Sequence, residues 1–241
     1  MKIGILGTRG IPNNYGGFEQ FAEFFSIHAA QAGHSVSVYT PHNHSYDETT
    51  FEKVTLIKCY DPEYKIGTAG QFIYDLNCIL DARKRNFDII LQLGYTSSAF
   101  WYDFHPKNSI VITNMDGLEW KRNKWGKYAK KFLRFSEMLA VRYADSIIAD
   151  NKEIQRHVQT EYSKESILIA YGGDHTKFES ITNQTFEKYP FLKHEYAFKV
   201  CRIEPENNIE MILKAFSQKA TCNLVIVGNW NHSDFSREMY H

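Results

Sequence analysis

Short runs of aliphatic and β-branched residues alternate along the chain with longer stretches in which apolar residues recur every three or four positions. This alternation is typical of βαβ units, in which parallel strands are joined by helices. It predicts an α/β, Rossmann-like domain with a parallel sheet. The expected helices are Phe18–Ala32, Ala69–Asn86, Lys124–Ala144 and Lys152–Glu161. The expected strands are Lys2–Gly7, Ser35–Thr40, Val54–Cys59, Asp88–Leu93, Ser109–Asn114, Ser146–Asp150 and Ile167–Ala170.

A second domain is expected to follow the polar, aromatic stretch Glu179–His194, which reads as a connection. Two parallel strands and one helix cannot bury both faces of a sheet, so we expect this second Rossmann-like domain to be incomplete. The boundaries are then 1–178 for the first domain and 179–241 for the connection with the start of the second. The new βαβ unit comprises Tyr196–Arg202, Asn208–Lys219 and Asn223–Val227.

The composition of the 241 residues is that of an ordinary soluble protein, with 43% hydrophobic residues, 23% charged residues and no net charge. A neutral chain has no long-range preference for nucleic acid, so any basic cluster must act locally. The start, MKIGILG, reads as a strand and lacks the features of a signal peptide. The cysteines and histidines lack metal-ligand spacing, so we expect no metal site and a cytoplasmic protein with reduced core cysteines. The cysteines are Cys59, Cys78, Cys201 and Cys222.

The loop after the first strand, GTRGIPNNYGGFE, is rich in glycine. Gly7 and Gly10 frame Thr8 and Arg9, whereas Gly16 and Gly17 immediately precede the first helix. Glycine lets a ligand approach the backbone, and the free N–H groups of a helix start favour anions. The loop is neither a GxGxxG fingerprint nor a P-loop, so we expect it to pass over a bulkier ligand. The alternative is a long turn whose glycines have positive φ.

Two further segments lie where strands of the first sheet end. ITNMDGLEWKR places Asp116 and Glu119 beyond the carboxyl end of a strand, which is where ligands of open α/β sheets bind. The alternative is that Asp116 is part of a simple turn and Glu119 is a solvated acid. YGGD, Tyr171–Asp174, closes the last strand of the first domain, where a backbone that crosses toward the cleft would need glycine.

A basic and aromatic segment begins immediately after Glu119. Trp120, Trp125, Tyr128 and Phe132 are interleaved with cations and could dock on an anionic membrane surface. The alternative is that the aromatic side chains face the core and the lysines face water. Nucleic-acid binding is less favoured because no recognised nucleic-acid module surrounds the cluster. The cations are Lys121, Arg122, Lys124, Lys127, Lys130, Lys131 and Arg134.

The second domain contributes the motif KVCRIEPENN. Arg202 ends a strand beside the start of a helix, where a guanidinium can hold a diphosphate. Asn207 or Asn208 can cap that helix. The alternative is a surface arginine that pairs with Glu204 or Glu206.

In combination, these motifs resemble those of the family 4 glycosyltransferases, which have two facing Rossmann-like domains in the GT-B architecture, and most of all their bacterial rhamnosyltransferase branch. The resemblance implies transfer of a sugar from dTDP-rhamnose to a lipid-linked saccharide at the cytoplasmic face of the membrane. It further implies retention at the anomeric carbon in surface polysaccharide synthesis, with no metal or other cofactor. Gly16 and Gly17 would then lie against the donor phosphates, and Arg202 would bind the diphosphate from the other domain, with Glu206 and Asn207 beside it.

By the same resemblance, Asp116 falls where many relatives carry a histidine near the reacting sugar and would be catalytic. The expected acceptor side or cleft comprises Arg9, Tyr15, Glu119, Tyr171 and Gly173.

The chain departs from the family pattern in three places. Asn207 stands where many relatives have a lysine, and Cys201 stands where glycine is frequent, which weakens the expected donor binding. The late Glu-x7-Glu motif is missing after the strands of the second domain, so it would lie beyond His241. A nucleotide- or sugar-binding module without turnover is therefore the main alternative function. A nicotinamide-dependent oxidoreductase is disfavoured because no acid follows the second strand, which ends at Thr40-Pro41-His42.

Overall fold

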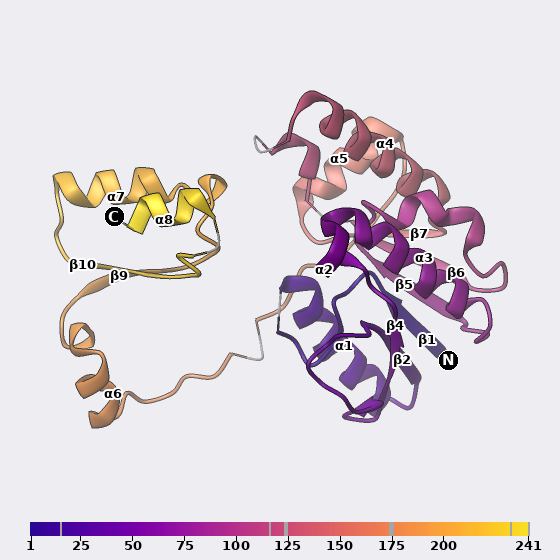
Figure 1. Ribbon diagram of the computed structural model, residues 1–241, viewed down its shortest axis with the longest axis horizontal. Coiled ribbons are helices and arrows are strands. Elements are labelled where there is room, and N and C mark those ends of the chain that lie inside the picture. The colour runs from indigo at the N-terminus through magenta and orange to yellow at the C-terminus, as the bar shows by residue number, and fades with distance from the viewer. Residues whose placement is uncertain (15, 116, 123–124, 174–175, 232, 241) are drawn as a thin grey trace. The chain divides into compact units, whose positions relative to one another are not determined.

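The computed structural model describes residues 1–14, 16–115, 117–122, 125–173, 176–231 and 233–240. The chain divides into two compact units, unit 1 (Met1–Gly172) and unit 2 (Gly173–His241) (Figure 1). The division comes a little earlier in the chain than the boundary after Phe178 that the sequence suggested.

Unit 1 is built on an eight-stranded sheet with the order β3-β4-β2-β1-β5-β6-β7-β8. All neighbouring strands are parallel except β3 and β4, which form an antiparallel hairpin. The α/β fold class predicted from the sequence is confirmed. The strands are β1 (Lys2–Leu6), β2 (Ser35–Pro41), β3 (Thr50–Phe51), β4 (Val54–Cys59), β5 (Ile89–Leu93), β6 (Ile110–Met115), β7 (Ser146–Ala149) and β8 (Ile167–Leu168).

Helices join these strands and cover the sheet. The α-helices are α1 (Gly17–Gln31), α2 (Glu63–Ile66), α3 (Gly70–Ala82), α4 (Lys127–Tyr143) and α5 (Lys152–Tyr162). The 3₁₀ helices are η1 (Gly67–Ala69), η2 (Ser98–Phe104) and η3 (Glu119–Lys121).

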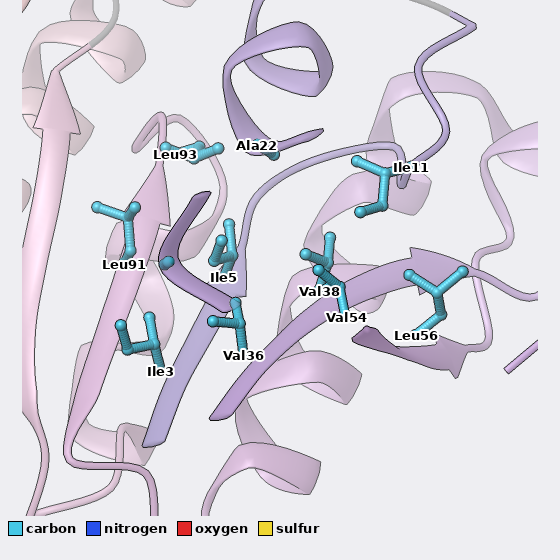
Figure 2. Close-up of a cluster of buried hydrophobic side chains, with 11 residues drawn as sticks. Ile3, Ile5, Ile11, Ala22, Val36, Val38, Val54, Leu56, Leu91 and Leu93 are labelled. Atoms are coloured by element: carbon cyan, nitrogen blue, oxygen red, sulfur yellow. The ribbon is translucent and has the colours of Figure 1, made fainter. Parts of the chain in front are cut away.

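The core of unit 1 follows from the two-residue alternation of the central strands. Ile3 and Ile5 of β1 point to the same face as Val36 and Val38 of β2 and pack with Ala22 of α1 (Figure 2). The intervening positions face the opposite side, where Leu6 and Ile90 pack with Cys78 and Ile79 of α3. Each fully buried aliphatic side chain contributes about 1.5–3 kcal/mol relative to an exposed one, so both faces hold the sheet in place.

Unit 2 contains a two-stranded parallel sheet in which β10 pairs with β9. Ile203, in the loop after β9, and Ile209, at the start of α7, are buried. Cys59 and Cys78 of unit 1 are buried, as expected, whereas Cys201 and Cys222 of unit 2 are only partly buried. The elements are α6 (Asn183–Lys188), η4 (Pro190–Lys193), β9 (Tyr196–Val200), η5 (Pro205–Asn207), α7 (Ile209–Gln218), β10 (Asn223–Val227) and α8 (Asp234–Tyr240).

Helix α4 does not match the alternative in which the aromatic side chains of the basic segment face the core. Tyr128 is 87% exposed, Phe135 48% and Phe132 37%. The buried stripe of α4 is instead formed by smaller side chains and one acid, which are Leu133, Ser136, Glu137, Ala140 and Val141.

Candidate functional site

The strand order of unit 1 reverses between β1 and β5. From β1 the chain builds β2 and β4 on one side, then returns to add β5, β6, β7 and β8 on the other. In open parallel sheets, ligands bind beyond the carboxyl ends of the strands at this topological switch point. The candidate site of unit 1 is therefore the edge formed by the loop after β1 and the turn after β5.

Two glycines let the loop after β1 lie close against neighbouring strands. Gly7 has a φ of +81°, and a Cβ there would stand 2.1 Å from the carbonyl oxygen of Leu93 in β5. Gly10 has a φ of +92°, and its Cβ would stand 2.5 Å from the methyl group of Thr40 in β2. For these two glycines, positive φ and close packing therefore explain the residue type without a ligand.

Acidic side chains of α1 already bind part of this loop. Glu19, which is 4% exposed, accepts a hydrogen bond from the amide of Arg9 at 2.7 Å, and Glu23 accepts one from the amide of Asn13 at 2.5 Å. These carboxylates hold the loop in shape, and they place negative charge near the first turn of α1.

The second pair of glycines differs from the first. Gly16 is extended at the start of α1, and among the described residues no side chain caps this helix. A Cβ at Gly17 would meet no atom of the described residues within 4 Å. Packing therefore does not require glycine at Gly17, and the first amides of α1 can accept an anion. Tyr15, another candidate, lies outside the described residues.

The Arg9 side chain is engaged in an ion pair. Its Nη2 donates to Oε1 and Oε2 of Glu63 at 2.6 and 2.8 Å, and both side chains are about three-quarters buried. Gln71 also donates to Glu63, at 3.3 Å. In this arrangement the guanidinium ties the loop after β1 to α2.

Two buried acids near the turn after β5 were missed in the sequence. Asp75 of α3 accepts a 2.5 Å hydrogen bond from Oγ of Ser97, and Asp61 follows β4. Burial raises the pKa of Asp75 to about 7, the bond from Ser97 lowers it, and the nearby Asp61 adds a smaller increase. A carboxyl group that titrates near neutrality at a sheet edge is suited to proton transfer. The signal in the sequence that could have revealed Asp75 is its place on the same helix face as the apolar Cys78, Ile79 and Ala82.

The carboxyl ends of β6 and β8 meet through Asn114 and Tyr171. Nδ2 of Asn114 donates to the hydroxyl group of Tyr171 at 3.1 Å. The buried Oδ1 of Asn114 and Oε1 of Gln92 in β5 have no hydrogen-bond partner among the described residues. A buried polar atom without a partner costs about 1–3 kcal/mol, so these two oxygens favour a polar ligand that donates hydrogen bonds at this edge.

The remaining candidates of unit 1 are placed as follows. Asp116 lies outside the described residues. Glu119 forms a 2.6 Å ion pair with Arg122, and both side chains are about four-fifths buried, so Glu119 is not a freely solvated acid.

The cations of the basic segment divide into two groups. Arg122 pairs with Glu119, while Arg134 pairs with Glu161 at 2.9 Å and lies over the ring of Trp120. Lys121 also lies over the Trp120 ring. For Lys127, Lys130 and Lys131, no carboxylate lies within ion-pair distance among the described residues. Lys124 lies outside them.

In unit 2, Arg202, Glu206 and Asn207 lie in one tight loop between β9 and α7. The Arg202 side chain is 62% exposed, and its Nη1 lies 3.6 Å from Oε1 of Glu204. Nδ2 of Asn207 donates to the carbonyl group of Arg202 at 2.7 Å, so Asn207 orders the loop. Asn208 precedes α7 but its side chain does not cap it, contrary to one expectation. Gly173 begins unit 2, and its carbonyl oxygen accepts a bond from Thr176.

The described part of the chain contains no cluster of three or more His, Cys, Asp or Glu side chains that could hold a metal ion. Its helices are also too short or too polar to cross a lipid bilayer.

Comparison with solved structures shows a glycosyltransferase-like fold. Sucrose-phosphate synthase from Thermosynechococcus elongatus aligns with 99% of this chain at a TM-score of 0.73 and 17% identity. Apo UGT2 from Phytolacca americana aligns with 97% at a TM-score of 0.52 and 10% identity. The chain spans 65% of the length of each of these proteins. This likeness shows an α/β fold of the GT-B kind.

Comparison with sequences is less informative about function. No curated protein matches the chain. The family model that matches is described as a domain of unknown function, DUF1972, and it covers residues 1–174. The chain therefore belongs to the DUF1972 family.

Proposed function

We propose that this chain is part of a nucleotide-sugar-dependent glycosyltransferase. The observation that carries the proposal is the start of α1. In a glycosyltransferase-like fold, α1 starts at Gly16 and Gly17 beside the switch point of the sheet, and no side chain of the described residues caps its first amides. The more specific proposal is the transfer of rhamnose from dTDP-rhamnose to a lipid-linked saccharide in bacterial surface polysaccharide synthesis, with retention and without a metal.

The chemistry requires stabilisation of a leaving diphosphate. As the bond to the sugar breaks, negative charge grows on the phosphate oxygen, and preorganised N–H groups and cations lower the barrier. We assign the amides after Gly16 and Gly17 to a donor phosphate. In unit 2 we assign Arg202 to the diphosphate, because its side chain is 62% exposed and its Nη1 lies 3.6 Å from Oε1 of Glu204, beyond hydrogen-bond distance. Loss of one such donor commonly costs about 3 kcal/mol, or a hundredfold in rate.

The acceptor side of the reaction is assigned to unit 1. The sugar becomes cation-like in the transition state, and Asp116 would stabilise it or orient the acceptor hydroxyl group. In a retaining front-face reaction the leaving phosphate can take the proton itself, so the proposal requires no general base. The polar edge formed by Asn114 and Tyr171 supports a site for sugar hydroxyl groups.

A product assay tests the proposal. The complete enzyme is mixed with a lipid-linked saccharide acceptor and a panel of radiolabelled nucleotide sugars, and the label in the lipid phase is measured. The proposal expects transfer, greatest from dTDP-rhamnose. Binding of a nucleotide sugar without transfer would favour the alternative, a binding module without turnover.

We further propose that α4 docks unit 1 on an anionic membrane. Its exposed face combines Tyr128, Phe132 and Phe135 with Lys127 and Lys131. Phe132 stacks on Phe100 of η2 with ring centroids 5.0 Å apart, so the aromatic face extends beyond the helix. Amphipathic helices that pair aromatic with basic residues lie in the membrane interface, at about 1 kcal/mol per cation near the surface.

Charge reversal tests the membrane proposal. Replacement of Lys127, Lys130 and Lys131 by glutamate should weaken binding to phosphatidylserine-containing vesicles by at least about a hundredfold, since three favourable cations are lost and three repelled anions are added. A control with the same change of net charge replaces the exposed Lys53, Lys84 and Lys164. Equal weakening in the two triple variants would contradict a docking role for α4.

A further inference from the structure

Glu137 is a buried acid in the middle of the apolar stripe of α4. Its side chain is fully buried, and Leu133, Ala140 and Val141 lie on the same helix face. A buried carboxylate is costly unless several hydrogen bonds compensate for the lost water. Its presence at this position therefore calls for a specific role.

Four donors from three other parts of unit 1 converge on this carboxylate. Oε1 accepts hydrogen bonds from Tyr162 at 2.6 Å and lies 2.7 Å from Nε2 of His157, both on α5. Oε2 accepts from Nε1 of Trp120 in η3 at 2.9 Å and from the hydroxyl group of Tyr95, after β5, at 3.1 Å. A carboxylate offers about four acceptor positions, so these partners use its full capacity.

The bond from Trp120 connects Glu137 to the DGLEWKR segment, which follows β6. Trp120 lies in η3, within the segment Gly117–Lys121 that directly follows Asp116 in sequence and contains Glu119. The indole group can only donate, so its orientation depends on a fixed acceptor at this point. Arg134, which lies on α4 like Glu137, is placed over the Trp120 ring with its guanidinium carbon 5.2 Å from the ring centroid. It adds a second contact between α4 and Trp120.

We propose that Glu137 is a positioning residue, which holds the segment Gly117–Lys121 at the edge of the sheet through the indole N–H of Trp120. This inference rests on the proposed glycosyltransferase function, because it assigns the segment to the acceptor side of the reaction. Glu137 does not touch substrate. It joins the turn after β5, η3 and α5 at one buried point, and the alignment of the segment depends on that junction.

The test compares two variants that each remove one donor to the same carboxylate. Trp120→Phe removes the bond to the segment and keeps an aromatic ring, whereas the matched control Tyr162→Phe removes a bond from α5. We expect similar falls in melting temperature for both. In the complete enzyme, Trp120→Phe should lower kcat at least tenfold with less than a threefold change in the KM for the nucleotide sugar, and Tyr162→Phe should leave kcat within threefold.

Conservative substitution of the carboxylate provides the rescue. In Glu137→Gln the amide oxygen can still accept from Trp120, while the amide nitrogen can face Tyr162 and His157, both of which can accept. We therefore expect this variant to keep most of the kcat that Trp120→Phe loses. If kcat falls equally in Trp120→Phe and Tyr162→Phe, or in neither, the carboxylate only stabilises the fold.

Native-state trypsin cleavage after Lys121 and Arg122 gives a readout that does not depend on activity. Release of the segment should speed this cleavage at least tenfold in Trp120→Phe, whereas cleavage in Tyr162→Phe should stay near the wild-type rate. Unchanged cleavage in Trp120→Phe would overturn the positioning role. A wild-type enzyme that transfers no sugar would instead overturn the proposed function, and the cleavage rates would still decide whether Glu137 holds the segment.

Discussion

Substitution of Gly17 by alanine separates a ligand role from a folding role at the start of α1. A Cβ at this position would lie more than 4 Å from the other atoms in the described part of the chain, and Gly17 already belongs to the helix. Alanine is a better helix former than glycine by about 0.8–1.0 kcal/mol. Gly17→Ala should therefore leave the free energy of unfolding unchanged or raise it by up to about 1 kcal/mol.

Gly7→Ala serves as the contrasting variant in the same loop. Its φ of +81° costs a side-chain-bearing residue about 1–2 kcal/mol. The new Cβ would also stand 2.1 Å from the carbonyl oxygen of Leu93 and 2.5 Å from Nε2 of Gln92, so β5 or the loop must shift. We expect a loss of more than about 2 kcal/mol, and each kcal/mol lowers the melting temperature by about 2–4 °C in a chain of this size.

Calorimetric titration of dTDP-rhamnose, with urea unfolding in parallel, measures both quantities. If a donor phosphate lies against the first amides of α1, the methyl group of Gly17→Ala should weaken binding at least tenfold, or about 1.4 kcal/mol, without loss of stability. Gly7→Ala, in contrast, should lower the free energy of unfolding. A Gly17→Ala protein with wild-type affinity and turnover would refute the assignment of the phosphate to this helix start.

Three further predictions concern a buried acid, a helix cap and a loop arginine. Burial raises the pKa of Asp75 from 3.8 to about 7, so between these pH values the folded state keeps a proton that the unfolded state has lost, and stability falls as pH rises. Urea unfolding should show that the free energy of unfolding is a few kcal/mol lower at pH 8 than at pH 5, and that Asp75→Asn removes this difference. An identical pH dependence in the two proteins would contradict this prediction. Asn151 caps α5 by accepting from the amide of Ile154 at 2.9 Å, so Asn151→Ala should lower the free energy of unfolding by about 1 kcal/mol, and an unchanged thermal midpoint would argue against the cap. Arg202→Ala should weaken donor binding or turnover more than tenfold with little change in melting temperature, since the Arg202 side chain is 62% exposed and its Nη1 lies as far as 3.6 Å from Glu204; unchanged kinetics would remove Arg202 from the site.

The central strands could be predicted because burial on both faces makes them continuous apolar runs. Hairpin β3–β4 could not, since its two-residue turn is Glu52-Lys53, both with positive φ, rather than the Asn-Gly or Asp-Gly pair that usually marks such a turn. Helix α8 was missed because the sequence after Gly228 is polar.

The buried acids show a different limit of sequence reasoning. One alternative from the sequence was that the aromatic side chains of α4 face the core, yet the buried face carries Glu137. An acid flanked by Leu133 and Ala140 at helical spacing was a detectable signal. Its meaning depends on Tyr95, Trp120, His157 and Tyr162, whose positions around one carboxylate are set by the tertiary fold.

The most direct test of the central claim is equilibrium binding to the unmodified protein. Thermal shift and calorimetry would compare dTDP-rhamnose, dTDP, UDP-glucose and NADH, because a ligand of the native state raises the melting temperature by mass action. The account predicts saturable binding of nucleotide diphosphates and nucleotide sugars, tightest for dTDP-rhamnose, and none of NADH. Binding of NADH alone, or of none of these ligands, would contradict it.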